Sequence, residues 1–239
     1  MLLEHPYVRN SERFRLPSEK ATQDALYSSA EILAAVSNLR DENAREARKL
    51  RYELLTTGLA LEANRSPEIF SVLESLKRNL LVNSNIELFV VPGKSFAASV
   101  HRISDDAYVI LLSASIMEVL ELDELTFVLA HELAHVAFNH FDLLRISSDK
   151  LPSRLSTALF SARRLGEVSA DLVAASLTQN PASARRALAK SIVGKNNQLI
   201  RLDMGADKLQ LQEIVVLLEQ DQSLFEVTCT HPASVLRVY

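Results

Sequence analysis

Residues 123–140 read DELTFVLAHELAHVAFNH, an apolar segment with ionisable side chains in its middle. His131 and His135 are four residues apart, so on a helix they lie about 40° apart around the axis and one turn apart along it. Burying two imidazoles and the Glu132 carboxylate is costly unless each group has a partner. A divalent metal bound by both rings would be that partner, with Glu132 reaching a metal-activated water. This spacing is typical of zinc-dependent hydrolysis.

A catalytic zinc takes three protein ligands and keeps one position open, so a third ligand must come from elsewhere in the chain. Residues 163–177, RRLGEVSADLVAASL, predict a second apolar helix, with Glu167 and Asp171 on one face. We expect Glu167 to bind the metal and Asp171 to orient a ligating histidine through its far nitrogen. A solvated acid pair is an equally open interpretation. His140 would face away from His135 on a continuous helix, which predicts a place beside the ligands or at the surface.

The segments HELAH at 131–135 and EVSAD at 167–171 together resemble the gluzincin metallopeptidases, which include the bacterial protease HtpX and the CAAX prenyl protease. Thr-His-Pro at 230–232, followed by Arg237, is similar to another segment of that family. Residues 94–97, KSFA, resemble its Asn-Ala-Phe-Ala edge-strand motif, although Lys and Ser replace the first two residues. The resemblance covers about residues 67–239.

The resemblance implies one Zn²⁺ held by His131, His135 and Glu167, with Glu132 as general base and acid. It also implies that Asp171 orients a ligand and that His231 lies near the substrate carbonyl. Apart from the resemblance, Tyr108 is a weaker candidate for that place. An extended peptide would bind along the edge strand, at Ser95, Phe96, Ala97 and Ala98.

The elements that must position these residues can also be read from the pattern. Helix is predicted over about 18–64 and 67–81, and again from 116 onward with a break at Asn180-Pro181; Asp123 is the expected N-cap of the metal-binding helix. Segments 86–92, 97–103 and 107–113 predict three short strands. The expected fold is α+β and predominantly helical: an N-terminal helical extension over 1–66, then a zincin-like metallopeptidase domain over 67–239 with a three-stranded sheet and an active-site helix.

Composition limits the partners and the compartment. The chain has 239 residues, 48% hydrophobic and 23% charged, which is ordinary for a globular protein. A net charge of −4 gives no electrostatic reason to expect nucleic acid. Neither a signal peptide nor a run of apolar residues long enough for a membrane helix is visible, and the single cysteine, Cys229, cannot form an internal disulfide. A soluble, cytoplasmic protein is expected.

The sequence therefore predicts a zinc metalloendopeptidase acting on a polypeptide substrate. Two alternatives stay open. One is a non-catalytic module that zinc stabilises, with the N-terminal helices as the surface for a protein partner. The other is a latent protease held inactive by its own helical segments.

Overall fold

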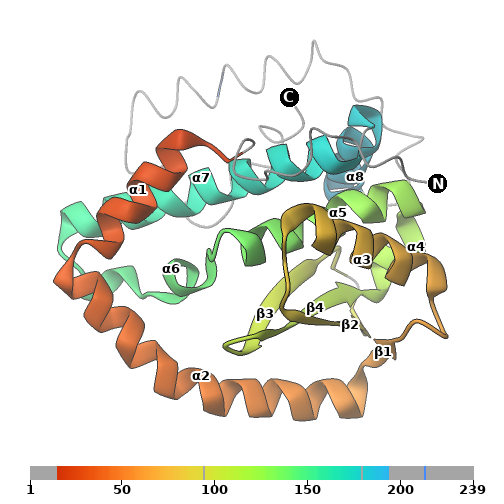
Figure 1. The fold of residues 1–239 in the computed structure, drawn as a ribbon, viewed down its shortest axis with the longest axis horizontal. Coiled ribbons are helices and arrows are strands. Elements are labelled where there is room, and N and C mark those ends of the chain that lie inside the picture. The colour runs from red at the N-terminus through yellow and green to blue at the C-terminus, as the bar shows by residue number, and fades with distance from the viewer. Residues whose placement is uncertain (1–14, 94, 179, 194–212, 214–239) are drawn as a thin grey trace.

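The computed structural model describes residues 15–93, 95–178, 180–193 and 213. Helices predominate around one small sheet (Figure 1). The elements in chain order are α1 (Pro17–Tyr27), α2 (Ala30–Thr57), β1 (Leu59–Leu61), α3 (Pro67–Leu80), β2 (Asn85–Val91), β3 (Ala98–Ser104), β4 (Ala107–Ser113), α4 (Ala114–Val119), α5 (Leu122–Ala137), α6 (Phe141–Arg145), the short 3-10 helix η2 (Ser148–Lys150), α7 (Ser153–Thr178) and α8 (Pro181–Val193).

The sheet has four strands in the order β1-β2-β4-β3, so the predicted count of three is wrong. β2 and β4 are parallel, and the two outer pairs are antiparallel. The fourth strand, β1, falls where helix was predicted as far as residue 64. Gly58 ends α2 in an extended conformation, and a side chain there would come within 2.9 Å of the Leu54 carbonyl oxygen. The chain therefore leaves the helix and pairs Leu59–Leu61 with β2.

Helices cover both faces of the sheet, with α2 along one face and α3 and α5 on the other (Figure 1). On the α2 face, Leu50 and Leu54 pack against Phe89 and Val109. The opposite face belongs to the main hydrophobic core, which also takes in parts of α7 and α8. No helix among the described residues is long and apolar enough to cross a bilayer.

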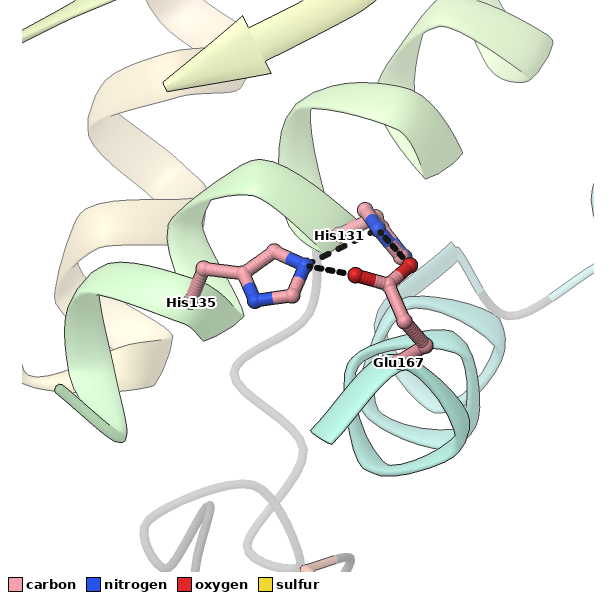
Figure 2. A group of neighbouring side chains, drawn as sticks. All are labelled: His131, His135 and Glu167. Atoms are coloured by element: carbon pink, nitrogen blue, oxygen red, sulfur yellow. Dashed lines mark hydrogen bonds and ion pairs between the residues drawn. The ribbon is translucent and has the colours of Figure 1, made fainter. Parts of the chain in front are cut away.

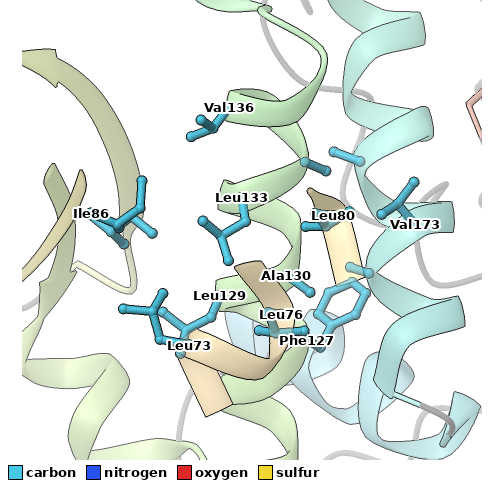
Figure 3. Packing of buried hydrophobic residues seen from close by; sticks show 14 of the residues in the cluster. Leu73, Leu76, Leu80, Ile86, Phe127, Leu129, Ala130, Leu133, Val136 and Val173 are labelled. Carbon is cyan, nitrogen blue, oxygen red and sulfur yellow. The ribbon is translucent and has the colours of Figure 1, made fainter. Parts of the chain in front are cut away.

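α5 runs through the middle of this core, as its nearly uniform apolar sequence predicts. Leu129 and Leu133 are fully buried, and Figure 3 shows them between side chains of α3 and the sheet, with Val173 of α7 nearby. The predicted N-cap, Asp123, is wrong by two positions, because Glu121 holds that place and the Glu124 carboxylate accepts its backbone N–H. The core fixes α5 rigidly, and with it the ionisable side chains in its second half.

Candidate metal centre

The metal centre is built where α5 and α7 pack against each other. His131, Glu132 and His135 all lie within the second half of α5, and all three are buried. Glu167 lies within α7 and is 2% exposed. One nitrogen from each histidine and one carboxylate oxygen of Glu167 lie within 4.8 Å of one another, and Figure 2 shows the three side chains turned toward a common point. Two helices thus bring three potential ligands together.

The distances between the converging atoms suit a tetrahedral zinc ion. His131 Nε2 and His135 Nε2 are 3.1 Å apart. Glu167 places Oε2 3.5 Å from the first of these nitrogens and Oε1 3.4 Å from the second. Ligand atoms about 2.0–2.1 Å from a tetrahedral zinc lie about 3.3 Å from one another. Two imidazole nitrogens and one carboxylate are also the ligand set of several catalytic zinc sites. The side chains present therefore fit the ion.

Asp171 determines which nitrogen of His131 faces the centre. Its Oδ1 lies 2.9 Å from His131 Nδ1. A carboxylate oxygen accepts, so Nδ1 donates to Asp171, and Nε2 is the nitrogen that can bind a metal once it gives up its proton. Asp171 is one helical turn beyond Glu167 on α7, as the i, i+4 spacing predicts. The same face of α7 therefore supplies a ligand and the group that orients another.

The electrostatics of the cluster favour positive charge at its centre. Burial lowers the pKa of His131, but the hydrogen bonds and charges of Asp171 and Glu167 outweigh it and raise this pKa to about 10. Burial and the neighbouring His131 charge hold the pKa of His135 well below its usual value. One ring is therefore neutral, and the carboxylates of Glu167 and Asp171 stabilise a cation between α5 and α7.

His140 lies beside the ligand His135, one of the two places that the sequence predicts, but it reaches that place through a turn after α5. α5 ends at Ala137, and Asn139 takes a left-handed conformation with φ of 51°. The chain turns there, and the His140 backbone N–H donates to the His135 carbonyl oxygen. The His140 ring is buried, with its Nδ1 2.8 Å from His135 Nδ1. The assumption of a continuous helix through residue 140 is wrong, and the ring faces a ligand.

The predicted substrate-binding residues lie at the start of the edge strand. Ser95, Phe96 and Ala97 precede β3, and Ala98 is its first residue. The main chain of Ala97 is already paired with Ser113, both through its N–H and through its carbonyl oxygen. The main-chain groups of Ala97 therefore face β4, and peptide binding along residues 95–98 stays a prediction.

Of the two candidates for the group near the substrate carbonyl, Tyr108 and His231, the structure describes only Tyr108. Tyr108 is 6% exposed and packs on Phe141 with ring centroids 5.1 Å apart, inside the core. His231 lies outside the described residues, as do Cys229 and Arg237. The metal centre therefore rests on the α5 and α7 residues alone.

A buried site of two histidines and one glutamate on packed helices is the arrangement of a zincin-like metallopeptidase. The sequence profile of Peptidase family M48 matches residues 81–161, which supports this class. The family implies zinc-dependent hydrolysis of peptide bonds. The match contains His131, Glu132 and His135 and ends before Glu167. No curated protein and no solved structure gives a significant match to the chain.

Proposed function

We propose that this protein is a zinc-dependent endopeptidase whose ion is held by His131, His135 and Glu167. The observation that carries the proposal is the convergence of three ligand atoms, one from each residue, within 4.8 Å of one another inside the core. Zinc bound there would supply Lewis-acid chemistry, because it polarises a carbonyl and lowers the pKa of water toward about 7.

Glu132 is the general base of the proposed reaction. It follows His131 directly on α5 and is 7% exposed, so its carboxylate belongs to the same buried region as the ligands. It accepts a proton from the attacking water and passes it to the leaving amine. A metal site that served only stability would have no use for a carboxylate at this position. Glu132 is therefore the residue that separates an enzyme from a zinc-stabilised binding module.

The edge of the sheet offers a place for an extended peptide. β3 is an outer strand and pairs only with β4 among the described residues. α5 packs against β3, so a peptide added to that edge would lie beside the helix that carries the ligands. Binding through the main chain suits internal stretches of a polypeptide, which favours endopeptidase activity over the trimming of chain ends.

The test compares the full-length protein with Glu132→Gln and with Glu53→Gln, an exposed control on α2. Zinc content is measured after dialysis, and cleavage of denatured casein is followed with and without a chelator. Glu132→Gln should keep its zinc and lose about 10²- to 10⁴-fold in activity, since it loses only the base. Glu53→Gln should match the unchanged protein. Near-normal activity of Glu132→Gln would remove Glu132 from this role, and failure of the unchanged protein to take up zinc would refute the proposed site.

A further inference from the structure

A line of buried polar groups connects α1 with the metal centre. Glu19, in the first turns of α1, is 1% exposed. Its Oε1 lies 3.5 Å from His140 Nε2, and His140 Nδ1 lies 2.8 Å from His135 Nδ1. The order is therefore Glu19, His140, His135 and then the point where the three ligands meet. Glu19 precedes His135 by more than a hundred residues and lies outside the part of the chain that matches Peptidase family M48.

The chemistry of the two rings fixes which nitrogen on this line carries a proton. His135 Nε2 faces the other ligands, so it must present a free electron pair to a metal and the ring proton must sit on Nδ1. His135 Nδ1 then donates to His140 Nδ1, which must accept. A neutral His140 consequently carries its proton on Nε2, the nitrogen that faces the Glu19 carboxylate. A carboxylate can only accept, so the arrangement is consistent at every step.

We propose that Glu19 and His140 are positioning residues of the metal centre: through them α1 fixes the tautomer and the orientation of His135. They would serve this ligand as Asp171 serves His131. The inference rests on the proposed zinc site and assigns a function to the N-terminal helix.

Neighbouring side chains hold Glu19 in the position that this function needs. Arg15 binds both carboxylate oxygens of Glu19, with Nη2 to Oε1 at 2.9 Å, and also contacts Gln23. Gln23 Nε2 in turn donates to the carbonyl oxygens of Phe138 and Asn139, at 3.2 and 3.3 Å. Those two carbonyls belong to the turn that carries His140. α1 therefore holds the carboxylate that faces the His140 ring as well as the backbone from which that ring extends.

The packing around His140 leaves this ring little freedom. The cavity between α1, α7 and the two histidines is about 10 Å³, close to the size of a single water molecule and too small for a substrate. Gly166, next to the ligand Glu167, makes the close approach possible, because a Cβ there would lie 3.3 Å from His140 Nδ1 and Cε1. The polar groups in this region are therefore placed to serve each other and His135.

The experiment measures zinc affinity of the full-length protein by competition with a chromophoric chelator, and the visible absorption spectrum after loading with Co²⁺. Glu19→Gln and His140→Phe should each weaken zinc binding by about 10- to 100-fold, the usual effect of removing a group that orients a ligating histidine. Both should also shift the Co²⁺ absorption bands. His140→Gln should retain more affinity than His140→Phe, since an amide can accept from His135 and donate to Glu19 whereas a phenyl ring can do neither.

Glu124→Gln is the matched control, because Glu124 is also a fully buried glutamate paired with basic side chains, Arg186 and Lys190. It should leave the zinc affinity and the Co²⁺ spectrum unchanged. The inference is overturned if Glu19→Gln and His140→Phe fold and bind zinc as tightly as the unchanged protein. Equal losses in Glu19→Gln and Glu124→Gln would also overturn it, since the effect would then be one of general stability. If His140→Phe does not fold, Glu19→Gln and His140→Gln decide the question. Absence of zinc binding by the unchanged protein would instead refute the proposed function.

Discussion

Glu19 is also the buried charge whose effect on stability can be worked out most directly. Burial raises the pKa of Glu19, but Arg15, through its hydrogen bonds and its charge, and the neighbouring His140 outweigh it and lower this pKa from 4.5 to about 2. The variant Glu19→Gln keeps the size of the side chain and does not titrate. The difference in free energy of unfolding between the two proteins therefore isolates the contribution of this one carboxylate as the pH changes.

The expected size and sign of this difference in free energy of unfolding follow from the lowered pKa of Glu19. A fall from 4.5 to about 2 corresponds to about 3 kcal/mol, since each pKa unit is worth about 1.4 kcal/mol. The folded protein holds this proton less tightly than the unfolded chain does. The stabilisation is therefore complete above about pH 5.5 and disappears as the pH falls toward about 2. At pH 3 the difference in free energy of unfolding between the unchanged protein and Glu19→Gln should therefore be about 2 kcal/mol smaller than at pH 6.

Urea unfolding followed by far-ultraviolet circular dichroism, in steps from about pH 6 to about pH 2.5, measures this difference. A chelator is present throughout, so that release of metal in acid does not contribute. Glu53→Gln, on the exposed part of α2, serves as control and should show no comparable change with pH. A difference between the unchanged protein and Glu19→Gln that stays constant from pH 6 to 2.5 would refute the reasoning, because Glu19 would then titrate alike in the folded and unfolded chains.

Two further variants test the packing around the centre. Gly166→Ala should weaken zinc binding by about tenfold, because its Cβ crowds the His140 ring at 3.3 Å. In the metal-free protein the better helix propensity of alanine, about 1 kcal/mol, offsets the effect of this crowding on stability. Unchanged zinc affinity, measured by chelator competition, would show that the ring can move aside freely. Leu133→Ala should lower the free energy of unfolding by about 2–5 kcal/mol, since Leu133 is fully buried. The control Leu33→Ala, at a position 51% exposed, should change it by less than about 0.5 kcal/mol. Similar losses for the two leucine variants in urea unfolding would contradict the assigned core.

The parts of the site that could be predicted are those that a single helix places by its own geometry. The spacing of His131 and His135 puts both rings on one side of α5 whatever surrounds that helix. Glu167 and Asp171 follow the same rule on α7, and their apolar neighbours indicate that this face is buried. What spacing could not supply is the approach of the two helices, which the structure shows directly. Peptide binding at the edge strand, and any function of His231, stay predictions.

The parts of the fold that could be predicted are likewise those that local sequence determines. A long helical segment, three of the four strands and the start of a helix at Pro67 all follow from local composition and from proline and glycine positions. β1 was missed because three residues, Leu59–Leu61, are too few to show alternation, and only pairing with β2 makes them a strand. The end of α2 had a local signal in Gly58, where an added Cβ would lie 2.9 Å from the Leu54 carbonyl oxygen of the same helix; the contact with Phe89 of β2, at 3.2 Å, is tertiary and could not be predicted.

His140 and Glu19 show where inference from spacing must fail. Helical geometry turns His140 away from His135 only if the helix continues, and it ends three residues earlier through a left-handed residue that a helix pattern does not reveal. Glu19 gives even less signal, because a glutamate in the first turn of an amphipathic helix is an ordinary solvated residue on base rates. It is buried because Arg15 and Gln23 accompany it and because α7 has a glycine where the His140 ring must fit. None of these conditions is local to α5, so the ligands of such a site can be found from a motif, whereas the groups that orient them depend on how distant helices pack.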